Sequence, residues 1–183
     1  MGVHGVAMTT VQAKKFEAVI WCPASNYFLL NKTAAMDDLK KHTTILFGTD
    51  STLTGSWNIW DHIRQARETN MLTDAELYDS LHPGGSQTDV DNRGSIVVVK
   101  KGNRIIVRFF YATQPEDILL VVHDGEVRLF DNTMLGQLEH LNLKEFSKVF
   151  MGRTCKYVQG DLPGVMQQIK AYYPGAIFPL TAI

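Results

Sequence analysis

The sequence changes character at Pro83-Gly84-Gly85-Ser86, a cluster of turn-forming residues. Before it, short apolar segments alternate with segments of helical periodicity, a pattern typical of parallel α/β folds. After it, apolar segments follow one another with no helix between them, which favours antiparallel pairing. We therefore expect two domains, an α/β part over residues 1–82 and a β-rich part with terminal helices over residues 83–183. A length of 183 residues, at roughly 150 residues per domain, leaves room for one full core and a smaller module.

In the α/β part, two apolar runs rich in β-branched and aromatic residues predict buried strands at 18–22 and 43–47. Pro23 ends the first run and Gly48 ends the second. The helices expected in this part are a short one after a Thr9–Gln12 capping box, 34–41, 56–69, and one that begins with a Thr73–Glu76 capping box. Strands and helices that alternate in this way imply parallel pairing.

In the β-rich part, turn signals separate short apolar segments. The elements expected there are strands 95–99 and 104–110, a hairpin over 117–130, a weak helix over 138–151 and a helix capped by Asp161. The hairpin is expected to turn at Asp124-Gly125, because this pair tolerates the positive φ angles of a type I′ turn.

Charge and composition exclude several classes of function. The 18 basic and 19 acidic side chains leave a formal charge of −1, so no overall positive field attracts nucleic acid or an anionic membrane. We expect a small-molecule partner instead. No apolar run approaches the roughly 18 residues of a membrane-spanning helix, and residues 1–10 lack a secretory pattern, so the cytoplasm is the expected location. Cys22 and Cys155 have neither metal-ligand nor disulfide-framework spacing and are expected to be reduced.

The segment Phe47-Gly48-Thr49-Asp50-Ser51 places a carboxylate directly after an apolar strand. In parallel α/β folds, active sites are built where the carboxyl ends of the strands meet. Asp50 is therefore a candidate catalytic residue. The alternative is that Asp50 caps the helix that follows the strand.

Three further polar residues stand where strands are expected to end. His4 is a candidate site residue, and the alternative is a surface or hydrogen-bonded histidine. Ser25 and Asn26 follow the strand at 18–22 and could contact a ligand, although turn formation alone also explains them. The remaining histidines form no HxH or HExxH pattern.

Four segments, in this order and with these gaps, resemble the later part of metal-dependent amidohydrolases, in particular the cytosine-deaminase, guanine-deaminase and chlorohydrolase-like branch. They are His4-Gly5, Trp21-Cys22-Pro23-Ala24-Ser25-Asn26, Phe47-Gly48-Thr49-Asp50-Ser51 and Asn58-Ile59-Trp60-Asp61-His62-Ile63-Arg64. The resemblance covers residues 1–82 and continues more loosely into the β-rich part. It implies a partial (β/α) TIM-type barrel, made of the last three strand–helix units, followed by a small antiparallel β-sandwich-like module with terminal helices.

The resemblance also implies roles for the candidate residues. In the family, one or two divalent ions, commonly zinc or iron, activate water for the hydrolysis of carbon–nitrogen bonds other than peptide bonds. Asp50 would be a metal ligand and would take the proton from the water, and His4 would contact the water or the substrate. Ser25 and Asn26 would be substrate-binding residues at the mouth of the site.

The family's HxH pair and fifth-strand histidine have no counterpart in this sequence, whereas catalytic zinc usually has three protein ligands. The resemblance therefore implies the C-terminal portion of a hydrolase, such as a deaminase, whose active site is incomplete and does not bind the ion by itself. It also implies an oligomer or a complementing N-terminal polypeptide as partner. The alternative from another class is a non-catalytic α/β plus β-sandwich module for association or ligand binding.

Overall fold

A computed structural model of the chain describes residues 1–81, 94–101 and 110–182. They form two compact units, one with residues 1–81 and 110–112 and the other with residues 94–101 and 113–182. The domain boundary expected at Pro83-Gly84-Gly85-Ser86 lies outside the described residues. So does nearly all of the strand expected at 104–110.

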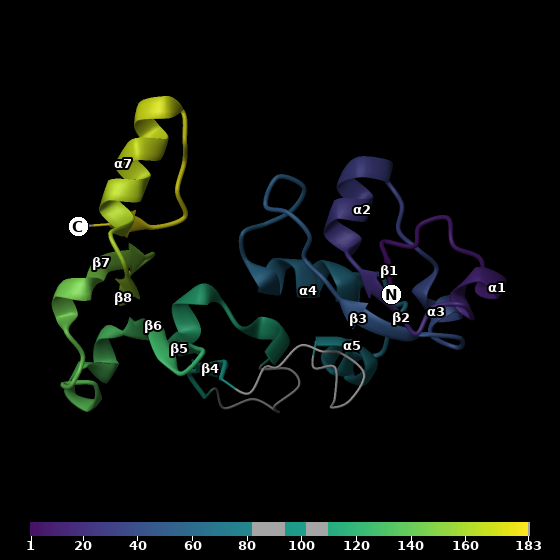
Figure 1. Cartoon of the computed structure of the whole chain (residues 1–183), viewed down its shortest axis with the longest axis horizontal. Coiled ribbons are helices and arrows are strands. Elements are labelled where there is room, and N and C mark those ends of the chain that lie inside the picture. Colours follow the sequence, from purple (N-terminus) through teal and green to yellow (C-terminus); the bar gives the residue numbers. More distant parts are fainter. Residues whose placement is uncertain (82–93, 102–109, 183) are drawn as a thin grey trace. The chain divides into compact units, whose positions relative to one another are not determined.

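The first unit is built on a three-stranded parallel sheet with the strand order β1-β2-β3 (Figure 1). The central strand β2 pairs on both sides, with Ile20 opposite Val3 of β1 and Leu46 of β3. Helices connect the strands, as parallel pairing requires. The elements are β1 (Gly2–Val3), α1 (Thr10–Ala13), β2 (Ala18–Trp21), α2 (Pro23–Leu30), α3 (Met36–Leu39), β3 (Thr44–Phe47), α4 (Ile59–Glu68) and α5 (Asp74–Leu81).

The core of this unit lies between the sheet and its helices. Val19 and Trp21 of β2 are fully buried, which explains why this strand reads as an unbroken apolar run. The helices α1, α3, α4 and α5 contribute apolar side chains to the same cluster. They include Ala13 of α1, Met36 and Leu39 of α3, Ile63 and Ala66 of α4, and Leu77 of α5.

Local hydrogen bonds fix where the helices of the first unit begin. Thr9 and Gln12 form the expected capping box, in which the Gln12 amide donates to the Thr9 hydroxyl and the Thr9 amide donates to Gln12 Oε1. At α4 the cap is Asn58, whose side chain accepts a hydrogen bond from the amide of Trp60. Asp50 therefore does not cap this helix, and that alternative is wrong.

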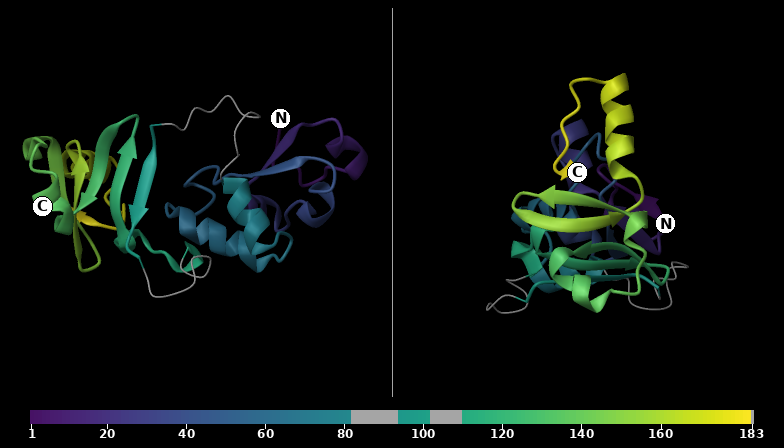
Figure 2. Two further views of the ribbon diagram at one scale, coloured as in Figure 1. Left: turned by 90° about the horizontal axis from the view of Figure 1, so that it is seen from below. Right: turned by 90° about the vertical axis from the view of Figure 1, so that its left-hand side faces the viewer.

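The second unit is a six-stranded antiparallel sheet with the strand order β4-β5-β6-β8-β7-β9 (Figure 2). Its first hairpin turns at Asp124-Gly125, where both residues have the positive φ angles expected from the sequence. The elements are β4 (Ile96–Val99), η1 (Pro115–Asp117), β5 (Ile118–His123), β6 (Glu126–Asp131), η2 (Asn132–Gln137), η3 (Leu143–Glu145), β7 (Phe146–Met151), β8 (Thr154–Gln159), α7 (Leu162–Tyr172) and β9 (Thr181–Ala182).

The expected partial (β/α) TIM-type barrel is wrong. The parallel strands form a separate three-stranded sheet, and among the described residues β1 and β3 each pair only with β2, whereas every strand of a barrel is paired on both sides. The second part is one antiparallel sheet rather than the two facing layers of a sandwich. Alternating strands and helices specify parallel pairing, but they do not specify the number, tilt and stagger of strands that closure demands.

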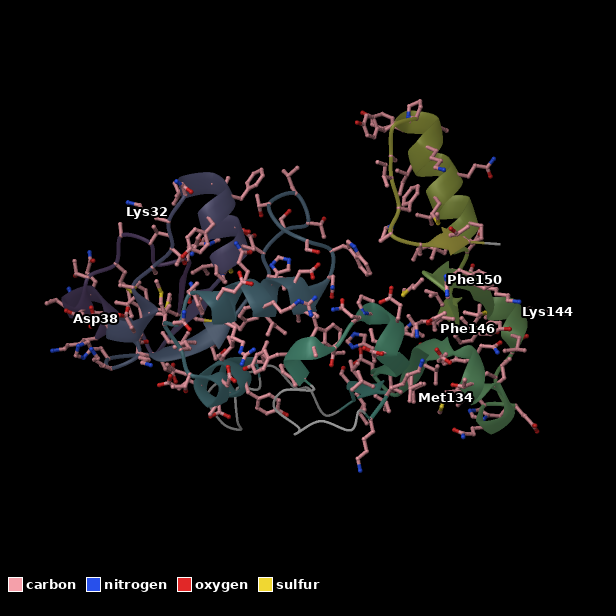
Figure 3. All side chains as sticks on the ribbon, turned by 180° about the vertical axis from the view of Figure 1, so that it is seen from behind. Lys32, Asp38, Met134, Lys144, Phe146 and Phe150 are labelled. Carbon is pink, nitrogen blue, oxygen red and sulfur yellow. The ribbon has the colours of Figure 1, made fainter. Side chains whose placement is uncertain are left out.

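The weak helix expected over residues 138–151 is also wrong. This stretch contains the short helix η3 and then β7, which pairs with β8 along its whole length. Aromatic packing explains the preference for a strand: the ring of Phe146 lies 5.3 Å from that of Phe130, and Phe130 stacks on Tyr157 at 4.9 Å. Figure 3 labels Phe146 and Phe150 on this strand.

The last helix, α7, begins as the sequence predicts. The Asp161 side chain accepts a hydrogen bond of 3.0 Å from the amide of Gly164, and no residue of the helix is buried. In the part of the chain that the structure describes, no helix combines the length and the apolar composition needed to cross a bilayer.

An ion pair lies in the middle of the antiparallel sheet. Lys156 of β8 is directly opposite Asp131 of β6, and both are almost completely buried. The Lys156 ammonium donates to Asp131 Oδ2 at 3.0 Å and to the carbonyl oxygens of Glu116 and Ile118 at 3.0 and 2.6 Å. Burial acts to raise the pKa of Asp131, but hydrogen bonds from Thr133 and Lys156, together with the ammonium charge, outweigh it and lower the pKa.

We predict that Lys156→Met lowers the free energy of unfolding by about 3–5 kcal/mol, because it leaves the buried Asp131 carboxylate without its counter-charge. Urea unfolding followed by circular dichroism measures the change. Lys148→Met, on the exposed part of the neighbouring strand β7, is the matched control and should change stability by less than about 0.5 kcal/mol. Equal effects of the two substitutions would contradict the importance of the pair.

Candidate functional site

The carboxyl ends of the three parallel strands bring three of the predicted site residues together. His4 directly follows β1, Asn26 lies in the first part of α2 after β2, and Asp50 follows β3. His4 Nδ1 is 2.9 Å from Asn26 Oδ1, and His4 Nε2 is 3.8 Å from Asp50 Oδ2. The side chains of His4 and Asp50 are 39% and 34% exposed, so both are accessible from solvent. The cluster therefore combines an imidazole, an amide and a carboxylate at one edge of the sheet.

The backbone at His4 and Asp50 adopts an uncommon conformation. Their φ angles are 65° and 61°, in the left-handed region that non-glycine residues seldom occupy. The amide of His4 also donates a hydrogen bond of 2.9 Å to the carbonyl of Ile20 in β2. Such strained residues tend to gather at functional sites when the surrounding structure holds them in place. Here both members of the imidazole–carboxylate pair share this property.

Buried hydrogen bonds hold the Asn26 side chain. Asn26 is 2% exposed, and its Nδ2 donates to Thr33 Oγ1 at 3.0 Å. The same hydroxyl oxygen accepts a hydrogen bond of 2.7 Å from the indole of Trp21, which is fully buried in β2. Thr33 was not among the residues expected at the site. Thr33 directly precedes the helix expected at 34–41, and only the folded chain brings it beside Asn26 and Trp21.

Ser25 has its contact with the loop after Asp50. It is fully buried, and its hydroxyl is 2.5 Å from the hydroxyl of Thr54. The contact therefore joins α2 to the loop that follows Asp50. The structure brings Asn26 to His4, whereas it gives Ser25 a partner in the loop.

The chain passes closely over β2 just before Asp50. A Cβ atom on Gly48 would lie 2.7 Å from Ile20 Cγ2 and 2.9 Å from Cys22 Sγ, both shorter than ordinary contacts. Only a glycine fits there without movement of its neighbours. Gly48 thus contributes to the position of Asp50 through the packing of the strand end.

Cys22, which directly follows β2, is not an activated nucleophile. Burial, and to a smaller degree the negative charge of Asp50, raises the pKa of the Cys22 thiol to about 11. The thiol is therefore protonated at neutral pH. A covalent mechanism through this cysteine is disfavoured, because the thiolate is the reactive form.

The candidate metal ligands at this edge of the sheet are His4 and Asp50. His4 and Asp50 would supply two ligands, whereas catalytic zinc usually has three from the protein. No group of three or more histidine, cysteine, aspartate or glutamate side chains suited to a metal occurs within residues 1–81, 94–101 and 110–182. His62 lies in α4, after the loop that follows Asp50, and is 1% exposed. Its Nε2 donates a hydrogen bond of 2.6 Å to the Ser56 carbonyl. The other ring nitrogen, Nδ1, is buried and has no hydrogen-bond partner within the described ranges.

We predict that Gly48→Ala lowers the free energy of unfolding by about 1–3 kcal/mol, because the added methyl group overpacks the contact with Ile20 and Cys22. Chemical denaturation followed by circular dichroism measures this. Gly136→Ala serves as the control, since a Cβ atom there meets nothing within 4 Å. If both substitutions leave stability unchanged, the close approach does not constrain the strand end.

We also predict that native Cys22 resists alkylation at pH 8. A pKa of about 11 leaves roughly 10²-fold less thiolate than an ordinary cysteine has. Iodoacetamide labelling read by mass spectrometry tests this, with the urea-unfolded chain as the reference for full reactivity. Equal labelling rates in the folded and unfolded chain would contradict the buried, protonated state.

Comparison with known proteins does not assign the chain to a family. No family model, no curated protein and no solved structure matches it. The arrangement of His4, Asn26 and Asp50 is therefore the observation that bears on function.

Proposed function

We propose that Asp50 transfers the proton and that His4 orients the water or the substrate in an amidohydrolase-like site that hydrolyses carbon–nitrogen bonds other than peptide bonds. The observation that carries the proposal is the 3.8 Å separation of His4 Nε2 and Asp50 Oδ2 at the carboxyl edge of a parallel sheet. Both side chains are partly exposed and lie within reach of a small molecule. The order of the motifs that carry these residues is the second support.

The pair suits a reaction in which water is the nucleophile. As the water oxygen bonds to the substrate carbon, the Asp50 carboxylate takes a proton from the water. It then passes that proton to the leaving nitrogen as the carbon–nitrogen bond breaks. His4 Nε2 accepts a hydrogen bond from the water or the substrate and orients it toward Asp50. Asn26 acts behind His4, because its contact is with the opposite nitrogen of the ring.

The Cys22 thiol and the Ser25 hydroxyl are both unsuited to act as nucleophiles, which favours direct attack by water over a covalent intermediate. The Cys22 thiol has a pKa raised to about 11, and Ser25 is buried and paired with Thr54. Neither has the partly exposed position beside a base that an activated nucleophile needs.

We propose that the remaining metal ligands come from another polypeptide chain. An oligomer or a complementing N-terminal polypeptide would supply the histidines that a zinc or iron site requires, and the substrate would be a small molecule. Nucleic acid and membranes are not proposed as partners. We place the protein in the cytoplasm, which fits its two free cysteines, Cys22 and Cys155.

The test uses the full chain, tagged and recovered from its source cells so that a bound polypeptide stays attached. Ammonia release is measured from cytosine and from guanine, with Zn²⁺ or Fe²⁺ supplied. We expect Asp50→Asn to lower the turnover rate by at least about 10²-fold, because the proton acceptor is lost. Asp37→Asn, at an exposed position in α3, is the matched control and should leave the rate unchanged.

Two results would overturn the proposal. Turnover that survives Asp50→Asn removes this carboxylate from the mechanism. Binding of cytosine or guanine without any ammonia release, measured by calorimetry on the same preparation, supports the non-catalytic ligand-binding alternative instead.

A further inference from the structure

The position of the proton on a neutral histidine ring depends on its hydrogen bonds. A neutral imidazole carries one proton, and the nitrogen that meets a fixed acceptor keeps it. In His4, Nδ1 lies 2.9 Å from Asn26 Oδ1, within hydrogen-bond range. Nε2 lies 3.8 Å from Asp50 Oδ2, which is too far for a direct hydrogen bond. The contact with Asn26 is therefore the one that selects the tautomer.

A hydrogen bond to Thr33 orients the side-chain amide of Asn26. An indole nitrogen can only donate, so the Thr33 oxygen is the acceptor in its hydrogen bond with Trp21. The same oxygen accepts the hydrogen bond from Asn26 Nδ2. With its nitrogen directed at Thr33, Asn26 presents its oxygen to His4. Trp21 is fully buried and Asn26 nearly so, which leaves little room for either group to reorient.

We propose that Asn26 and Thr33 are positioning residues that hold His4 in the tautomer with the proton on Nδ1, so that the unprotonated Nε2 faces Asp50. The use of this nitrogen in catalysis rests on the proposed function, whereas the tautomer itself does not.

The tautomer of His4 determines which groups can bind between His4 and Asp50. Nε2 and Asp50 Oδ2 are then two acceptors that face each other across 3.8 Å without a hydrogen bond between them. A group with two donor hydrogens, such as water or the exocyclic amine of an aminopyrimidine, satisfies both acceptors. This deepens the proposed function, because such an amine is also the leaving group in a deamination.

If the oxygen and nitrogen of the Asn26 side-chain amide exchange places, His4 carries its proton on Nε2 instead of Nδ1. This difference makes the proposal testable. In that arrangement the Thr33 hydroxyl donates to the Asn26 oxygen, the Asn26 nitrogen donates to His4 Nδ1, and the ring proton lies on Nε2. The two networks contain the same atoms, but they leave different nitrogens of His4 protonated.

The experiment is nitrogen NMR of the full chain labelled with ¹⁵N-histidine, at about pH 9, where histidine rings are ordinarily neutral. Two-bond proton–nitrogen correlations identify which ring nitrogen is protonated, and the spectrum of His4→Gln assigns the His4 signals among the 6 histidines. We expect His4 to show a protonated Nδ1 and an unprotonated Nε2. A protonated Nε2 in the wild-type protein overturns the proposal without the need for any variant.

Variants then test the two positioning residues. Asn26→Leu should lower the ratio of the Nδ1–H to the Nε2–H tautomer by about five- to tenfold, the effect of one net hydrogen bond. Asn26→Asp keeps an acceptor toward Nδ1 and should preserve the wild-type tautomer. Thr33→Val should lower the ratio in the same direction as Asn26→Leu, whereas Thr33→Ser retains the hydroxyl and should not.

An unchanged tautomer in both Asn26→Leu and Thr33→Val would show that these side chains do not set it. Because the spectra are recorded without substrate, their result is separate from the ammonia assay. The expected tautomer in a protein that releases no ammonia would contradict the proposed function alone, and the opposite tautomer in an active protein would contradict this inference alone.

Discussion

Parallel pairing of β1 and β3 on the two sides of β2 is the constraint on which the candidate site depends. All three strands run in one direction, and Val3, Ile20 and Leu46 lie in register, so the carboxyl ends reach one edge of the sheet together. His4 directly follows β1 and Asp50 follows β3 by a few residues, so their side chains meet at this edge. Val19 and Trp21 of β2 are fully buried, so packing of the core holds the strand ends in place.

Charged groups have different environments in the two units. In the second unit, Lys156 and Asp131 are buried, and three acceptors take hydrogen bonds from the ammonium group. Such a pair stabilises one register of β6 and β8 and is closed to ligands. In the first unit, His4 and Asp50 are partly exposed and too far apart for a direct hydrogen bond. A ligand can therefore reach His4 Nε2 and the Asp50 carboxylate.

The elements that the sequence predicts well are those with local signals. The apolar runs at 18–22 and 43–47 become β2 and β3, and the turn at Asp124-Gly125 is present because its backbone conformation depends on those two residues. The stretch 138–151 was predicted incorrectly, because pairing of β7 with β8 overrides a weak helical pattern. The barrel was wrong for a related reason, since the number of strands and the closure of a sheet are properties of the whole fold.

The ends of the strands that precede Asn26 and Asp50 follow from the sequence alone, because the apolar runs, Pro23 and Gly48 act locally. Only the tertiary structure decided which of these residues meet. The fold pairs Ser25 with Thr54 and brings Thr33 beside Asn26. These contacts depend on distances between segments far apart in the chain, and such distances are set by packing of the core rather than by any pattern of neighbouring residues.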